Sequence, residues 1–94
     1  MKTIISELDS MKSKLKDLGL NDTTKLKELI DRYRQLGREH NLSGSEYNAD
    51  YVENEKYKML LLRASKDRKW ERFKETIGEF DSILNNQIRQ LKNT

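Results

Sequence analysis

Cysteine and proline are absent from this chain of 94 residues, histidine occurs once, and glycine occurs four times. Without cysteine the chain can form neither disulfide bonds nor thiolate metal sites, and a single histidine excludes sites built on paired histidines. The few glycines do not form a glycine-rich phosphate loop. We therefore expect a protein that is not an enzyme, with no catalytic residues, no metal ligands and no cofactor.

Long apolar runs are missing as well, because hydrophobic residues make up 34% of the chain, against about 45–50% in typical domains. No stretch approaches the roughly 20 apolar residues of a transmembrane helix, and the N-terminus has no apolar run long enough for a signal peptide. We therefore expect a cytoplasmic protein, located in the host cytoplasm if a phage encodes it. We expect no membrane among its partners.

Charged residues are abundant at 37%, yet 19 basic and 16 acidic residues nearly cancel and leave a net charge of +3. At this low hydrophobicity disorder would require a higher net charge, so we expect a folded chain. Much charge with little apolar surface suits long, thin helices that bury only a narrow stripe. The length allows a single helical domain over residues 1–94. A homodimer, in which two copies complete one core, is an alternative to a monomer.

Apolar residues at steps of three and four make Trp70–Leu91 the central element of the predicted fold. Such steps place side chains on one side of a helix. This stripe consists of Trp70, Phe73, Ile77, Phe80, Leu84 and Leu91, and it is interrupted at Gln87. It holds the only tryptophan and both phenylalanines, so we expect it to form the core. Similar stripes predict a first helix from about Thr3 to Leu18 and a second that ends around His40.

Small polar residues and glycines predict where these helices end. Gly19 is expected to close the first helix in a left-handed conformation, and Asn21 or Asp22 to cap the second. Gly37, inside the second helix, marks either a close approach of two helices or a frayed end. After a polar loop, a third helix is predicted over roughly Glu46–Ala64.

The junction at residues 65–67 leaves two alternatives open. Either Ser65 or Asp67 caps a fourth helix after a tight turn, or one helix continues from Tyr47 to Leu91. We favour the turn, because a helix of that length would extend ~65 Å and could not pack along its whole length. The apolar run Met59–Ala64 is then expected where several helices meet. The predicted fold is all-α, a small bundle of three to four amphipathic helices with a long last helix.

Charge is unevenly distributed in the second half of the chain. Six basic residues fall within twelve positions, namely Arg63, Lys66, Arg68, Lys69, Arg72 and Lys74. Four acidic residues precede them, namely Glu46, Asp50, Glu53 and Glu55. The basic cluster predicts a DNA- or RNA-binding regulatory module. The alternative is a solvated surface, in which acidic residues early and basic residues late in a helix suit its dipole.

Arg34 and His40 have the spacing Arg-x5-His at the end of the second predicted helix. They resemble the Arg-x(4–6)-His pair of HEPN ribonucleases, a family in which the pair cleaves RNA across a dimer of helical bundles. A histidine near the negative end of a helix dipole is the interpretation that we favour.

Three tyrosines at the start of the third predicted helix are candidate contacts with a partner. Tyrosine is enriched in protein interfaces, and Tyr47, Tyr51 and Tyr57 lie where the helix is otherwise poor in apolar residues. The alternative is that these rings pack on the edge of the bundle itself. The function that we favour is a small non-enzymatic helical interaction protein, an accessory or inhibitor protein such as phages and mobile elements make. It would bind a protein partner and occlude the partner's working site.

Overall fold

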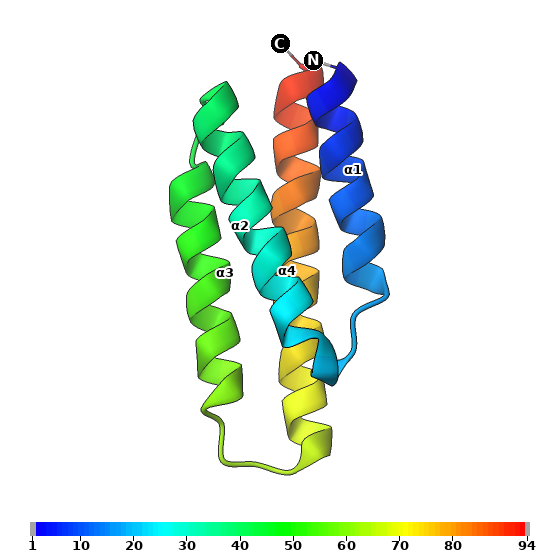
Figure 1. The fold of residues 1–94 in the computed structure, drawn as a ribbon, viewed down its shortest axis with the longest axis vertical. Coiled ribbons are helices and arrows are strands. Elements are labelled where there is room, and N and C mark those ends of the chain that lie inside the picture. Colours follow the sequence, from blue (N-terminus) through cyan, green and yellow to red (C-terminus); the bar gives the residue numbers. More distant parts are fainter. Residues whose placement is uncertain (1, 94) are drawn as a thin grey trace.

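The computed structural model describes residues 2–93, and within that part of the chain it contains four α-helices and one short 3-10 helix. The elements are α1 (Lys2–Lys16), η1 (Leu20–Asp22), α2 (Thr23–His40), α3 (Ser45–Leu60) and α4 (Lys66–Lys92). The four α-helices run alternately down and up a molecule that is 44 Å long (Figure 1). The prediction of an all-α bundle with a long last helix is confirmed, since α4 has 27 residues.

The packing of the helices leaves one side of α3 open to solvent. α4 packs against α1 on one side and α3 on the other, and α2 packs mainly against α3. Figure 1 shows α1 and α3 at opposite sides of the bundle, with α2 in front of α4. The edge between α1 and α2 is the loosest of the bundle. Because α2 and α4 cover two sides of α3, its remaining side faces outward.

The predicted stripe on α4 lies in the core, and its polar interruption lies there too. Phe73, Phe80 and Leu84 are fully buried, and the Tyr33 ring of α2 meets the Phe80 ring edge-on with centroids 5.9 Å apart. The Tyr33 hydroxyl donates a hydrogen bond of 2.7 Å to the side-chain oxygen of Gln87, which is also buried. A polar contact inside the core therefore fills the break in the apolar pattern.

Trp70 departs from its predicted place in the core, because 36% of the residue is exposed. Its ring stacks on Phe73 with centroids 6.0 Å apart and planes inclined by 20°. The Lys74 ammonium lies 5.5 Å from the ring centroid. Figure 1 shows that α4 begins beyond the end of α1, so its first turns have fewer helices around them than the rest.

The junction between α3 and α4 is a turn, as we favoured. The Ser65 hydroxyl oxygen accepts a hydrogen bond of 3.3 Å from the backbone N–H of Arg68, which caps the start of α4. However, α3 already ends at Leu60, four residues before the predicted end. The prediction that Met59–Ala64 lies where several helices meet was wrong for Leu60–Leu62, which are exposed. These leucines lie at the end of α3 and at the start of the α3–α4 turn, where other helices do not cover them.

The predicted left-handed conformation of Gly19 was also wrong, since its backbone is extended with φ −111° and ψ 179°. The Gly19 N–H donates a hydrogen bond of 2.8 Å to the Asp22 carboxylate. Asp22 therefore closes the turn before α2 and does not cap α2 with its side chain. Left-handed backbone occurs at Asn41, with φ 52°, and at Gly44, with φ 74°, on either side of the turn between α2 and α3.

Candidate interaction surfaces

The three predicted contact tyrosines are all exposed on α3. Tyr47 is 76% exposed, Tyr51 40% and Tyr57 47%. Residues four apart on a helix share a side, so Tyr47 and Tyr51 lie one above the other. Tyr57 comes six residues later and is displaced by about a third of a turn from Tyr51. The three rings therefore cover the outward side of α3 without converging on one point, and we call them the tyrosine face.

Two of these rings are held by contacts at opposite edges of α3. Hydrogen bonding to the Glu79 carboxylate of α4, together with partial burial, raises the pKa of the Tyr51 hydroxyl. The Lys56 ammonium lies 4.3 Å from the centroid of the Tyr57 ring. These contacts restrict the freedom of the Tyr51 and Tyr57 side chains.

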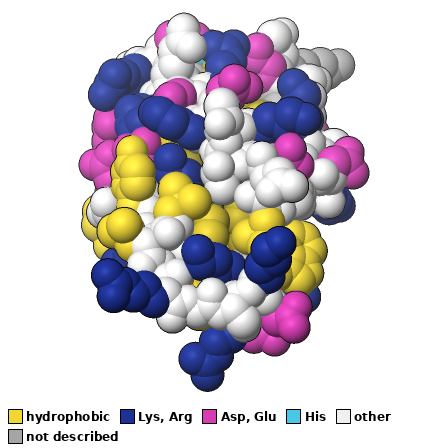
Figure 2. Space-filling view, turned by 60° about the horizontal axis from the view of Figure 1, so that its bottom comes forward, with side chains coloured by type: hydrophobic (Ala, Val, Ile, Leu, Met, Phe, Trp, Pro, Cys, Tyr) yellow, Lys and Arg dark blue, Asp and Glu magenta, His cyan; other side chains and the backbone are white. Residues whose placement is uncertain are grey.

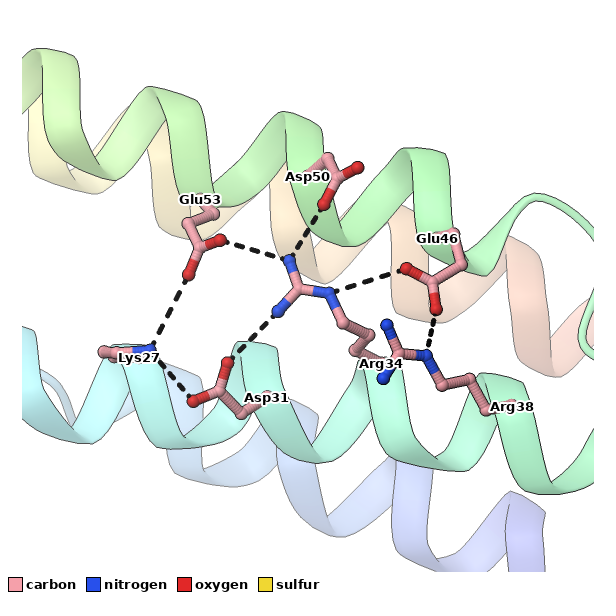
Figure 3. Close-up of polar contacts among 7 residues, drawn as sticks. All are labelled: Lys27, Asp31, Arg34, Arg38, Glu46, Asp50 and Glu53. Carbon is pink, nitrogen blue, oxygen red and sulfur yellow. Dashed lines mark hydrogen bonds and ion pairs between the residues drawn. The ribbon is translucent and has the colours of Figure 1, made fainter.

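The acidic residues early in α3 are paired with basic residues of α2 (Figure 3). Arg34 is the centre of this network, and its side chain is only 15% exposed. Its guanidinium lies 3.0 Å from Asp50, 3.2 Å from Glu53, 3.2 Å from Asp31 and 3.7 Å from Glu46. Lys27 and Arg38 extend the network by pairing with Glu53 and Glu46, respectively. The acidic cluster is therefore a contact between helices.

This network also bears on the ribonuclease resemblance. Four carboxylates surround the Arg34 guanidinium, and three of them belong to α3. The ion pairs of Arg34 therefore join α2 to α3, which is a structural role for this residue. His40 is exposed in the last turn of α2, as a histidine near the negative end of a helix dipole would be.

The six basic residues between α3 and the first turns of α4 are not equivalent. Arg72 pairs with Glu55 and, at 3.3 Å, with Glu75, while Lys74 lies over the Trp70 ring. The remaining four form no ion pair with any residue in the described part of the chain, namely Arg63, Lys66, Arg68 and Lys69. The structure thus separates the predicted nucleic-acid-binding cluster into four free cations and two that have partners.

Exposed apolar residues lie among the free cations, and sequence reasoning missed them. Leu61 is 80% exposed, and Leu60, Leu62 and Trp70 are each more than a third exposed. Figure 2, which brings this end of the molecule forward, shows hydrophobic side chains with lysines and arginines beside them. We call these four apolar residues and the four free cations the α3–α4 end. The sequence signal was the closeness of the leucine run to the Ser65 cap, which leaves little helix after Leu60.

Two hollows lie elsewhere on the surface. A groove of about 520 Å³ between α1 and α2 is lined partly by Met11, Leu18 and Leu29. A second hollow, of about 470 Å³, lies at the turn between α2 and α3 beside Tyr47. Among residues 2–93, no group of three acidic, histidine or cysteine side chains is placed to hold a metal ion.

In the same described range, every helix is too short or too polar to cross a bilayer. No protein-family model, no curated protein and no solved structure matches this chain.

Proposed function

We propose that this chain is a small non-enzymatic binding protein that docks a protein partner on the tyrosine face of α3. By lying against the partner it would occlude the partner's working site, as an accessory or inhibitor protein does. The observation that carries the proposal is the exposure of all three tyrosines on the outward side of one helix. The other tyrosine and both phenylalanines are buried, so α3 presents most of the aromatic surface that the chain exposes.

The chemistry of tyrosine supports a protein partner. A tyrosine ring offers a large apolar area with few rotatable bonds, and its hydroxyl can bond to a polar rim. α3 has apolar residues on both sides, since Val52 and Met59 face the core while the tyrosines face outward. The inward residues account for the packing of the helix against the core, so this packing does not require the outward tyrosine rings.

Nucleic-acid binding through Arg63, Lys66, Arg68 and Lys69 is the competing prediction. The absence of ion pairs at these four residues, within the range that the structure describes, favours it. The leucines beside them do not, because phosphate groups offer leucine no apolar contact.

The proposal is tested by capturing the partner from a lysate of the source organism with the tagged chain. We expect the wild type to retain one protein in stoichiometric amount, which is then purified. Tyr47→Ala and Tyr57→Ala are each expected to weaken its binding about tenfold, the effect of losing a hot-spot side chain. Affinity is read by isothermal titration calorimetry, and circular dichroism confirms that each variant is folded.

Lys14→Ala is the matched control, because Lys14 is an exposed residue of α1, at the other side of the bundle from α3. It is expected to bind the partner as the wild type does. Recovery of no stoichiometric protein would count against the proposal. So would a partner whose affinity is the same for the tyrosine variants and the control.

A further inference from the structure

We propose that the α3–α4 end binds the surface of an anionic lipid bilayer. This interaction uses other residues than the tyrosine face, so it goes beyond the function proposed above and does not depend on it. Two features of the α3–α4 end carry the inference, its exposed leucines and its unpaired cations.

The apolar part of this end is a turn that projects from the bundle. Leu60 ends α3, Leu61 and Leu62 follow it, and Leu61 is 80% exposed. Three adjacent leucines in contact with water are unfavourable for an isolated protein, because moving apolar surface out of water lowers the free energy. The acyl region of a bilayer provides an apolar environment for such a tip.

The charged part complements an anionic surface. Arg63, Lys66, Arg68 and Lys69 form no ion pair with described residues, and Lys74 lies against the exposed Trp70. Over residues 63–74, six basic residues outnumber two acidic ones. Clusters of four to eight basic residues on an amphipathic helix are typical of proteins that bind anionic lipid headgroups, and five of these six residues lie on the amphipathic helix α4.

The position of these residues suits a flat, extended partner. The α3–α4 turn lies at one extremity of the 44 Å axis, and both features occur at that extremity (Figures 1 and 2). A bilayer can therefore meet the leucines and the cations together without contacting the sides of the bundle. Trp70 would then lie near the headgroups, where tryptophan is enriched in membrane proteins.

Other occupants fit this end less well. A single-stranded nucleic acid would need an open aromatic face for base stacking, whereas Phe73 stacks on Trp70 and Lys74 lies over its ring. A second copy of the chain would bring cations against cations. The expectation of no membrane partner rested on the lack of a transmembrane segment and of a signal peptide. Binding to the surface of a bilayer requires neither of them.

The proposal is tested by co-sedimentation of the purified chain with vesicles of phosphatidylcholine containing about 30% phosphatidylserine, at about 0.1 M NaCl. Vesicles of phosphatidylcholine alone are the lipid control. We expect binding to the anionic vesicles, little binding to the neutral ones, and release by high salt. The fluorescence of Trp70, the only tryptophan, should shift to shorter wavelength when the anionic vesicles bind.

Two variants separate the apolar and the charged contributions. Leu61→Ser removes the most exposed leucine and is expected to lower the partition constant on the order of tenfold. Arg63→Glu/Arg68→Glu is expected to lower it at least about tenfold, because each cation near an anionic surface contributes about fivefold. Arg89→Glu/Lys92→Glu, at the other end of α4, makes the same change in net charge and should leave binding largely intact.

Absence of sedimentation with anionic vesicles would overturn the proposal, whether or not the chain binds a DNA or RNA duplex in a parallel gel shift. Equal binding to neutral and anionic vesicles would overturn the role of the cations. Binding that requires Arg63 and Arg68 but is unchanged in Leu61→Ser would overturn the insertion of the leucine tip. Loss of tyrosine-dependent capture would leave this inference standing, because the two experiments use different residues and different probes.

Discussion

Arg34 illustrates, at the scale of a residue, how a charged side chain can belong to the structure. The residue lies among basic and acidic neighbours in the sequence. That pattern is as compatible with a solvated surface as with a contact between helices. In the fold its guanidinium is largely removed from water and surrounded by four carboxylates from two helices. A buried cation of this kind is costly to leave unpaired, and its carboxylate partners depend on it in turn.

Replacing Arg34 should therefore destabilise the fold far more than replacing its neighbour Arg38. Arg34→Met is expected to lower the free energy of unfolding by about 2 kcal/mol, since partial exposure of the carboxylates reduces the cost of a fully buried break. Arg38→Met is expected to lower it by less than about 0.5 kcal/mol, because its pair with Glu46 is exposed. Urea unfolding of both variants measures the difference, and equal losses would contradict the network's structural role.

Lys56 is the reverse case, a buried cation without a carboxylate partner among the described residues. The residue is 3% exposed, and burial lowers the pKa of its ammonium below the ordinary value of 10.5. Between the folded pKa and that value the unfolded chain binds more protons than the folded chain. The contribution of Lys56 to stability therefore rises with pH in this interval, and its full cost is present below the folded pKa.

Lys56→Met should remove this cost. We expect the free energy of unfolding to increase by about 1 kcal/mol near neutral pH. The gain should shrink as the pH approaches 10.5, because the wild-type lysine is then increasingly neutral in both states. Urea unfolding at several pH values measures it, with Lys14→Met as an exposed control of the same chemistry. A gain that stays constant, or grows with pH, would contradict this account.

At the scale of elements, Gly37 permits the close approach of α2 and α3 at their turn. A Cβ atom added to Gly37 would overlap the Ser45 side chain, which lies in the first turn of α3 and is buried. Of the two predictions for this glycine, close packing is therefore correct. Backbone freedom is not the reason for glycine here, because Gly37 lies within the regular helix α2.

Gly37→Ala is accordingly expected to lower the free energy of unfolding by about 2 kcal/mol, through overpacking between the two helices. Gly78→Ala is the matched control, because an added Cβ at Gly78 in α4 would meet no atom of the described chain within 4 Å beyond its chain neighbours and the backbone of its own helix. That substitution should raise the free energy of unfolding by up to about 1 kcal/mol. Adding Ser45→Gly to Gly37→Ala should restore part of the loss. A Gly37→Ala variant as stable as the wild type in thermal unfolding would refute the close approach.

The helices themselves were largely predictable, because periodic apolar residues must share a buried side. The steps of three and four located the core of α4, and the turn at Ser65 followed from the limits on helix length. The exposure of Leu60–Leu62 was not predictable in the same way. A leucine's burial depends on whether a neighbouring helix reaches it, and the end of α3 lies beyond that reach. The burial of Gln87 was likewise not predictable, because its hydrogen-bond partner, Tyr33, lies 54 residues away in the sequence.

At the scale of the whole molecule, the bundle presents two separate surfaces. The tyrosine face was predictable residue by residue, since tyrosines at a thin stretch of helix have few apolar neighbours. The α3–α4 end was only half predictable. Its cations form a visible cluster in the sequence, but only the fold shows which of them are free and that leucines lie between them. Because the two surfaces are separate, substitutions in the tyrosine face should not affect binding at the α3–α4 end, and substitutions at the α3–α4 end should not affect binding at the tyrosine face.

The most direct test of the account measures how much of the captured partner binds to the wild type, to Tyr47→Ala/Tyr57→Ala and to Leu61→Ser in the absence of lipid. We expect the tyrosine variant to lose the partner and Leu61→Ser to retain it as the wild type does, because we propose that the partner contacts the tyrosine face and not the α3–α4 end. Retention by the tyrosine variant together with loss by Leu61→Ser would contradict the account, and would place the protein contact at the α3–α4 end.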